Sequence, residues 1–496
     1  MNIGNGIFKN INKPARYVGG EVNQIIKDKK KIKCNAVLCY PNIYEKAMSS
    51  NLVNVLYTNI NEIDGVYCKR SFAPDIDFEK LLKENKCSLY SLEDFESIKY
   101  SDVIIFVIEN ELDFTNFINM LDISGILDVA GKIKAPKIIA VTSNKINIKP
   151  IAQYIDVIFN CDYENHDLKK VIKYLQNYAA SGFDKEFFND TFEENKVAGY
   201  EEVEIRFPTD TIIPSIKIEN ASIIVDLSTI KSIDILIETV QNAMKKRGIN
   251  KVSFVNQDSI GELTFCEIIY RLKMNIDGIR ISGNGLDFNK FEPNVLNVII
   301  PCIEKSGLCF EVTTCSHKLI NKLNKGTEKE LLLERIKAVF KNNRSSLKLK
   351  FYIGLPNETF EDIDSIFELA EEVVNMYSQS RAKDKFSIKI YLQIYIPTLR
   401  DMEEYNVNNI NKLDTKIRYV KEKKSDPVIK WNIENTDRYI TKLLLQNGEK
   451  EVSKIVREAY DLGARFDADE SKYNKVVWDK VIFDNMNIVK KYTNAY

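Results

Sequence analysis

The feature that most constrains the fold is the alternation of short apolar segments with helical patterns along most of the chain. Two such series occur, one on each side of a polar stretch at 181–204. Apolar strands that alternate with helices favour parallel sheets, with helices packed against their faces. A chain of 496 residues can also hold two or three domains. The sequence therefore predicts an α/β protein with more than one domain.

The first series predicts a Rossmann-like or flavodoxin-like domain. The expected strands are 33–41, 66–72, 101–110, 135–143 and 156–162. The helical patterns between them would cover a parallel sheet on both faces. We assign residues 1–180 to this domain, with an N-terminal extension, and residues 181–215 to a linker.

The second series contains six strand-like segments, each separated from the next by a helical pattern. These segments are 221–227, 251–257, 278–284, 308–314, 347–355 and 387–397. Six successive β-α units favour a partial (β/α)6 barrel with functional loops at the carboxyl ends of its strands. We assign residues 216–400 to this partial barrel and 401–496 to a helical C-terminal region.

The charge balance and hydropathy argue against several classes of partner. With 70 basic and 71 acidic residues, the net charge of −1 gives no general attraction to nucleic acid or to a membrane surface. No apolar run approaches the roughly 18 residues that a membrane span needs, and the N-terminus lacks the pattern of a secretory signal. We expect a cytoplasmic protein without membrane contact.

The cysteines and histidines give no motif typical of a metal site. Nine cysteines, an odd number, are scattered along the chain without a C-x-x-C pair, which argues against a disulfide framework. The only histidines are His166 and His317, too few for a site built on several imidazoles. We expect no metal.

Five stretches carry a resemblance to one family. They are KPARYVGGE (13–21), YPNIYEKAMS (40–49), DFTNFINMLDISGI (113–126), KLKFYIGLPNETFEDI (348–363) and REAYDLGARFDA (457–468). The chain resembles the radical S-adenosylmethionine (SAM) proteins with an N-terminal cobalamin-binding-like domain, a group of unassigned substrate. The resemblance runs from about residue 10 to residue 470 and implies the same two α/β domains.

The resemblance also implies a chemistry that this sequence cannot support in the usual way. Such enzymes hold a four-iron cluster through C-x-x-x-C-x-x-C in the loop after the first barrel strand, and the open iron chelates SAM for radical cleavage. Here ASIIVDL (221–227) aligns with that strand, and the loop before the next helix is shortened to about STIK (228–231). No cysteine lies between Cys161 and Cys266. We expect neither a four-iron cluster nor radical chemistry.

The N-terminal domain lacks the expected cobalt ligand as well. The D-x-H-x-x-G pattern that would ligate cobalt is absent, and His166 is expected to be a surface or capping residue at a helix start. We expect no bound cobalamin, although a cofactor can bind without a histidine ligand.

Remnants of a SAM pocket are expected at two strand ends, by analogy with the family. The candidates are Asp258, Glu262, Gly354, Pro356 and Glu358. The first two lie in VNQDSIGE (255–262), where family members receive the methionine amino group. The others lie in GLPNET (354–359), whose Gly and Pro allow close backbone approach to a ligand. The alternative interpretation is that GLPNET is a strand-to-helix turn, in which Glu358 and Thr359 cap the following helix.

Cys315 and His317 are weak catalytic candidates. They lie together at the expected mouth of the fourth barrel strand, and a thiol–imidazole pair can support nucleophilic chemistry. Two such residues in one loop can also be a coincidence of spacing. Cys302, Cys309 and Cys315 are not expected to share a metal, because Cys315 would lie at the opposite strand end from the other two.

Three functions are compatible with these patterns. The first is a non-catalytic binding or regulatory partner of a related active enzyme, such as a complete radical SAM paralogue or another protein. The second is an enzyme with altered chemistry, which binds SAM or a nucleotide without a cluster, uses an unconventional cluster, or uses Cys315. The third is an RNA-binding or RNA-modification accessory protein, which the charge balance disfavours.

Overall fold

The computed structural model describes most of the chain. The described residues are 11–21, 24–127, 136–143, 146–160, 166–181, 216–217, 222–227, 230, 232–255, 257–305, 308–379, 385–404, 410–423 and 425–493. Contacts divide the chain into two compact units. Unit 1 comprises Met1–Pro214 and Leu444–Val489, and unit 2 comprises Ser215–Leu443 and Lys490–Tyr496.

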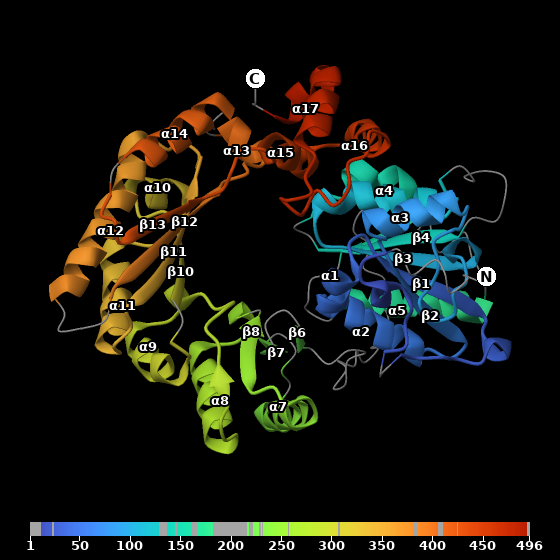
Figure 1. Cartoon of the computed structure of the whole chain (residues 1–496), viewed down its shortest axis with the longest axis horizontal. Helices are drawn as coiled ribbons and strands as arrows, with labels where there is room; N and C mark the ends of the chain where they lie inside the picture. The colour runs from blue at the N-terminus through green and yellow to red at the C-terminus, as the bar shows by residue number, and fades with distance from the viewer. Residues whose placement is uncertain are drawn as a thin grey trace. The chain divides into compact units, whose positions relative to one another are not determined.

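Unit 1 is built on a five-stranded parallel sheet (Figure 1). Its strands are β1 (Cys34–Tyr40), β2 (Val66–Phe72), β3 (Val103–Ile108), β4 (Lys137–Thr142) and β5 (Val157–Asn160). The order β2-β1-β3-β4-β5 is one of the two common orders of doubly wound sheets. All five strands expected from the sequence are present, and the prediction of a parallel α/β sheet is confirmed.

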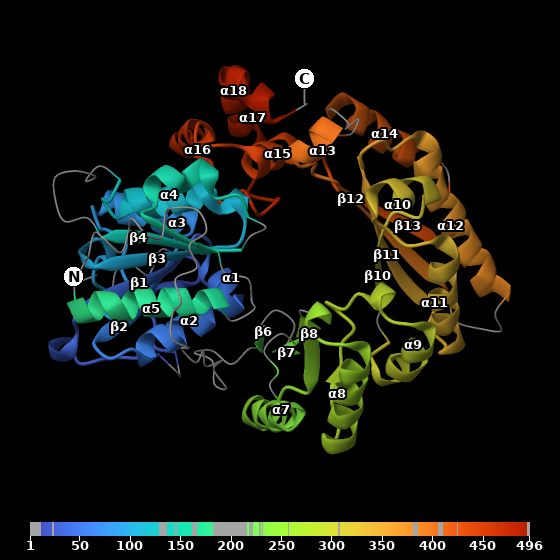
Figure 2. The same ribbon diagram turned by 180° about the vertical axis from the view of Figure 1, so that it is seen from behind.

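Helices cover both faces of this sheet, and they include segments from the C-terminal part of the chain. Among the described residues up to 181, the α-helices are α1 (Tyr44–Ser49), α2 (Asn51–Glu62), α3 (Ile76–Glu84), α4 (Phe114–Ile123) and α5 (His166–Ser181). α2 and α5 lie on one face, and α3 and α4 on the other (Figure 1, Figure 2). α16 (Val452–Asp461) packs on α4, and α17 (Lys475–Asp484) packs on α16.

Local sequence explains why these elements form. All six residues of β3, VIIFVI, are buried, as expected for a strand covered on both faces. Phe106 of β3 meets Phe117 of α4 on one face, with ring centroids 4.6 Å apart. The α2 helix begins after Ser50, whose hydroxyl accepts a hydrogen bond from the amide of Val53 at 3.3 Å.

Unit 2 contains two four-stranded sheets that share one hydrophobic core. The first has the order β6 (Ile216–Lys217), β7 (Ser222–Asp226), β8 (Lys251–Val255), β9 (Arg280–Ile281). The second has the order β10 (Leu308–Thr313), β11 (Ser346–Ile353), β12 (Ser387–Ile394), β13 (Ile429–Ile433). Every pair is parallel except β6–β7. The six expected strands are β7 to β12, and the series is interrupted after the short β9, where an isolated bridge joins Ile281 to Ile303.

The helices of unit 2 follow the strands as the sequence predicts. They are α7 (Ile233–Arg247), α8 (Glu262–Asn275), α9 (Pro293–Ile299), α10 (His317–Leu323), α11 (Lys329–Lys341), α12 (Phe360–Gln379), α13 (Leu399–Glu404) and α14 (Ile410–Glu422). Two further helices, α15 (Tyr439–Asn447) and α18 (Met486–Tyr492), each include residues of both units. α11 and α12 lie on one face of the β10–β13 sheet (Figure 1).

The β10–β13 sheet has one apolar and one polar face. Along β11, buried Leu347, Leu349 and Phe351 alternate with partly exposed Lys348 and Lys350. This alternation is typical of a strand that packs against helices on one side only. The opposite face therefore presents polar side chains.

β13 corrects the expectation of a purely helical C-terminal region. Its five residues, IKWNI, pair in parallel with β12, from Ile388–Ile429 to Leu392–Ile433. The segment is too short for a clear periodicity, and its strand geometry depends on the neighbouring β12 edge.

Among the described helices, none combines the length and the apolar composition that a membrane span requires.

Candidate functional site

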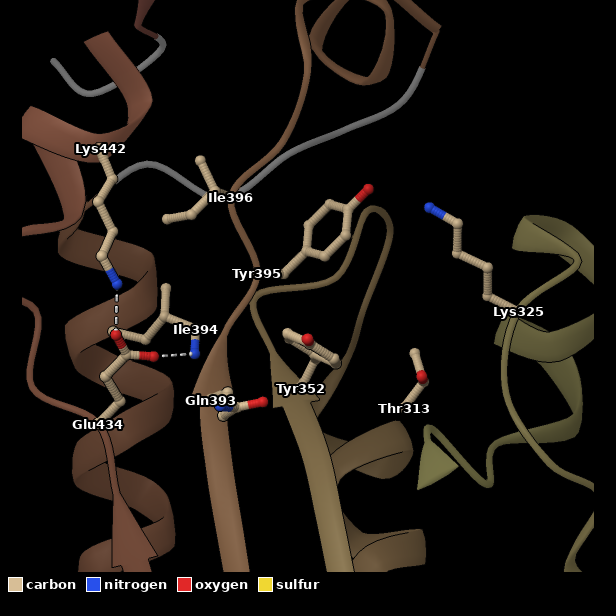
Figure 3. A pocket seen from close by; sticks show the side chains of 9 residues that line it. All are labelled: Thr313, Lys325, Tyr352, Gln393, Ile394, Tyr395, Ile396, Glu434 and Lys442. Atoms are coloured by element: carbon tan, nitrogen blue, oxygen red, sulfur yellow. Dashed lines mark hydrogen bonds and ion pairs between the residues drawn. The ribbon is translucent and has the colours of Figure 1, made fainter. Parts of the chain in front are cut away.

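An open cavity of about 530 Å³ lies at the carboxyl ends of the strands of the β10–β13 sheet (Figure 3). It is lined by Thr313, Lys325, Tyr352, Gln393, Ile394, Tyr395, Ile396, Glu434 and Lys442. Thr313 ends β10, Tyr352 lies near the end of β11, and Glu434 follows β13. The carboxyl ends of parallel strands are where α/β folds commonly bind ligands, and the volume suits a small molecule.

The acidic residue of this cavity is already engaged. One carboxylate oxygen of Glu434 accepts a hydrogen bond from the Lys442 ammonium at 2.6 Å, and the other accepts the amide of Ile394 at 2.9 Å (Figure 3). The charges of Glu434 and Lys442 therefore largely compensate each other. Because Lys325 also lines the cavity, the charged side chains of the lining sum to a net positive charge.

Two tyrosines form the aromatic part of the lining. The rings of Tyr352 and Tyr395 are perpendicular, with centroids 6.3 Å apart. The Tyr395 hydroxyl donates to Asp401 at 2.9 Å, which fixes the orientation of its ring. Burial raises the pKa of Tyr352, so its hydroxyl stays protonated and can donate a hydrogen bond at neutral pH.

The expected thiol–imidazole pair is not assembled in this structure. Cys315 is buried, and its thiol donates to the carbonyl of Ser365 at 3.5 Å. Burial raises the pKa of the Cys315 thiol, which disfavours the reactive thiolate. His317 is exposed in the first turn of α10 and contacts Asn321, four residues further along the helix. Neither side chain lines the cavity.

Asp258 and Glu262 follow β8 of the other sheet of unit 2, Asp258 in a 3-10 turn and Glu262 as the first residue of α8. Asp258 is largely exposed and forms an ion pair with Lys290. The carboxylate of Glu262 accepts a hydrogen bond from the amide of Glu292 at 3.0 Å. Both side chains therefore stabilise the surface connection before α9, and their suggested part in a SAM pocket stays a prediction.

GLPNET forms a tightly bonded turn between β11 and α12. Gly354 adopts a φ of +87°, which favours glycine, and its amide donates to the Glu358 carboxylate at 2.9 Å. That carboxylate also pairs with the ammonium of Lys416 at 2.9 Å. The amide of Thr359 donates to Asp362 at 2.8 Å, which is a capping interaction at the start of α12.

The role of this turn differs in part from the expected one. Thr359 lies at the helix start, as the alternative interpretation expected, whereas Glu358 bonds inward to Gly354 and Lys416. Pro356 is buried. These contacts explain the motif as a support for the end of β11, beside the cavity residue Tyr352.

The cysteines of unit 2 do not fit a four-iron cluster. The thiol of Cys302 donates to the carbonyl of Val298 within its own turn, and that of Cys315 donates to Ser365. Among the residues described, no group of three or more Cys, His, Asp or Glu side chains could hold a metal. The connection from β7 to α7 spans 227–232 and contains no cysteine. The expectation that no four-iron cluster is bound stays a prediction.

In unit 1, the chain itself fills the edge of the sheet between β1 and β3. Such a switch point is where doubly wound sheets bind cofactors. Here Asn42, after β1, donates to Asp113, after β3, at 2.8 Å. The Asn116 side chain donates to the carbonyl of Pro41 at 3.0 Å and accepts the amide of Phe466 at 3.0 Å. These polar side chains are therefore engaged with the chain itself, and the expectation that no cobalamin is bound stays a prediction.

Four of the five motifs that carry the resemblance lie in unit 1, where they take part in its packing. Arg70 of β2 is fully buried between Glu21, which it binds through two 2.9 Å hydrogen bonds, and Glu93 at 2.6 Å. Thr115 of α4 donates to Asp467 at 2.7 Å, across 352 positions of sequence. The N-terminal and C-terminal motifs therefore stabilise the fold of this unit.

Sequence reasoning missed the cavity residues Lys325, Tyr352, Glu434 and Lys442. The signal that could have found Tyr352 is its place near the end of a predicted barrel strand. Glu434 could not be found in this way, because β13 was not expected.

Comparison with known proteins agrees with part of this picture. Residues 53–198 match the family model for radical SAM proteins, N-terminal. An uncharacterized protein of Methanocaldococcus jannaschii, MJ0966, is 22% identical over 453 residues, which cover 85% of this chain and 90% of that protein.

Two solved structures are also similar at low identity. Coproporphyrinogen III oxidase (HemN) from Escherichia coli, a radical SAM enzyme, is 10% identical with a TM-score of 0.28, over 38% of this chain and 44% of that one. The cobalamin-dependent SAM radical enzyme OxsB is 11% identical with a TM-score of 0.37, over 93% of this chain and 56% of that one. The chain thus spans about half the length of each of these two solved proteins.

Proposed function

We propose that the chain is a radical SAM family member without the iron–sulfur cluster loop, and that it acts as a binding or regulatory subunit rather than as a radical enzyme. The match of residues 53–198 to the N-terminal family model supports the first part. The observation that carries this proposal is the short connection between β7 and α7. It spans 227–232 and holds none of the three cysteines that a cluster needs. Loss of the whole loop removes the ligands together with the space that they frame.

An exposed apolar stripe on α8 supports a protein partner. Leu263, Tyr270 and Met274 lie seven and four residues apart, so they share one helix face. Their exposed fractions are 80%, 59% and 66%. Exposed apolar residues grouped on one face are typical of protein interaction sites. The partner proposed is a complete radical SAM paralogue that carries the C-x-x-x-C-x-x-C motif.

Anaerobic reconstitution with iron and sulfide tests the loss of the cluster. We expect no stoichiometric iron and no broad visible band after desalting. About four irons per chain would overturn the proposal. The triple variant Cys302→Ser, Cys309→Ser, Cys315→Ser would then show whether these cysteines are the ligands.

SAM titration by calorimetry on the same sample tests the second candidate function. Saturable SAM binding without iron would favour altered chemistry over a binding subunit. Absence of both iron and SAM binding agrees with the proposal.

Co-expression with a complete paralogue from the same genome tests the partner. We expect Leu263→Glu together with Tyr270→Glu to abolish co-purification. Phe483→Glu is the matched control, because Phe483 is 73% exposed on α17 and lies outside the stripe. Equal loss in both variants, or no co-purification with the unaltered chain, would contradict this partner.

A further inference from the structure

The cavity at the ends of β10–β13 is lined by a cation, Lys325, that no carboxylate of the described residues binds directly. In the part of unit 2 that the structure describes, Lys325 makes no ion pair, and its ammonium lies over the ring of Tyr395, 5.5 Å from the centroid. Its charge helps to lower the pKa of Asp401, but that carboxylate is bonded to the Tyr395 hydroxyl and the Thr398 amide. Figure 3 shows this side chain extending from the end of α10 towards Tyr395. The other lysine of the lining, Lys442, is compensated by Glu434.

The backbone that carries Lys325 is fixed to the end of β10. Asn324 ends α10 with a φ of +49°, and Gly326 follows with a φ of +117°. A Cβ at Gly326 would lie 2.6 Å from the carbonyl oxygen of Thr314, so only glycine permits this approach. The amide of Thr327 donates to the same carbonyl at 3.0 Å. Lys325 therefore starts from a rigid position, unlike most surface lysines.

Thr313, which also lines the cavity, has strained backbone. Its φ is +64°, and the amide of Thr314 donates to the carbonyl of Val312 at 2.8 Å across it. This geometry is that of a γ-turn with positive φ, which is rare and costly for a β-branched residue. Strained residues of this kind cluster at ligand sites, where the surrounding structure holds them in place.

We propose that this cavity binds a small organic anion, either a carboxylate or a phosphate monoester. Its anionic group pairs with the Lys325 ammonium and accepts a hydrogen bond from the Tyr352 hydroxyl. The apolar part of the ligand packs against Tyr395 and Ile396, which line the same cavity. SAM is a poor candidate, because its sulfonium and ammonium groups outweigh its one carboxylate and the cavity already has a surplus cation. The proposal does not depend on the missing cluster loop.

Calorimetric titration of the full chain tests the proposal. The probes are phenyl phosphate and benzoate as the two anion types, with benzamide as the neutral and benzylamine as the cationic analogue. We expect saturable binding of at least one anion, weakened by salt, and no binding of benzamide or benzylamine. A preference for phenyl phosphate or for benzoate identifies the type of anionic group. Binding of neither anion, or equal binding of benzamide, would overturn the proposal.

Matched lysine variants assign the binding to this cavity. Lys325→Met is expected to weaken anion binding about tenfold or more, because it removes a charged hydrogen-bond donor. Lys325→Arg keeps the charge and is expected to stay within about threefold. Lys322→Met makes the same change on α10 outside the lining and is expected to have no effect. Equal affinities for Lys325→Met and the unaltered chain would refute the assignment.

Tyr352→Phe supplies a second, milder test, since it removes one hydroxyl and keeps the ring. This variant should weaken anion binding about threefold to tenfold. Iron content is measured on separate aliquots, so failure of anion binding and failure of the cluster-free proposal can be told apart.

Discussion

Lys416 and Glu358 form an ion pair of 2.9 Å in which both side chains are almost completely buried, with 6% and 2% exposed. The ammonium also donates to the Glu358 carbonyl at 2.8 Å. Burial raises the pKa of Glu358, and Lys416 opposes that shift. The GLPNET turn thus supplies Glu358 to a buried pair with Lys416 of α14, and this pair holds the end of β11.

This pair predicts a large asymmetry between single and double variants. Lys416→Met leaves Glu358 buried without its counter-charge and should destabilise unit 2 by about 3–5 kcal/mol. Glu358→Gln together with Lys416→Met should cost much less, because no charge is left uncompensated. Urea unfolding measures the free energy of unfolding of the single and the double variant, with Lys421→Met on the exposed side of α14 as the control. If the single variant is no less stable than the double variant, the pair does not have the stabilising role proposed.

The buried carboxyl of Asp113 predicts a specific pH dependence. Burial raises the pKa of Asp113 to about 8, and nearby Asp467 and Glu109 add to this shift. The unfolded chain ionises this group near pH 4. The folded state therefore holds the proton more tightly, and the stability that this provides at low pH is lost as the pH rises towards 8.

Asp113→Asn should remove this dependence while keeping an oxygen that can accept from Asn42. Its stability relative to the unaltered chain should rise by up to about 1.4 kcal/mol per pH unit between pH 5 and 8. Urea unfolding at pH 5, 6.5 and 8 measures the difference, and Asp484→Asn on the surface of α17 is the control. A difference that is constant with pH would show that Asp113 ionises normally in the folded state.

The close approach of Gly326 to β10 predicts a strong effect of one methyl group. Gly326→Ala places a Cβ 2.6 Å from the Thr314 carbonyl oxygen and should cost more than about 2 kcal/mol. Gly278 also has positive φ, but no atom lies within 4 Å of its would-be Cβ, so Gly278→Ala should cost only about 1 kcal/mol. Thermal unfolding of the two glycine variants compares their loss of stability. Gly326→Ala should also weaken anion binding, because the backbone next to Lys325 must move.

The environment of Cys315 predicts low thiol reactivity. Cys315 should react with a disulfide reagent only when the protein unfolds, whereas the half-buried Cys302 should react in the native state. Counting fast-reacting thiols in Cys315→Ser and in Cys302→Ser tests this: only the second change should lower the count. A fast thiol lost in Cys315→Ser would return Cys315 to the list of catalytic candidates.

Much of the fold could be predicted, because local sequence patterns indicate most of the strands and helices. The run VIIFVI in β3 and the regular spacing of β7 to β12 are sufficient to predict parallel strands. β13 was missed because five mixed residues have no pattern apart from their pairing with β12. The candidate site was predicted less well, since the motif GLPNET supports the cavity without lining it.

By itself, the sequence determined the α/β class, the order of the strands along the chain and the absence of cysteines between β7 and α7. These are properties of neighbouring residues, so periodicity and spacing reveal them. Only the tertiary structure decided that Thr115 meets Asp467, that Glu358 turns inward to Lys416 and that Lys325 faces Tyr395. Such pairs lie far apart in sequence, and whether a charged or polar side chain stabilises the fold or is available to a ligand depends on which distant residue folding places beside it.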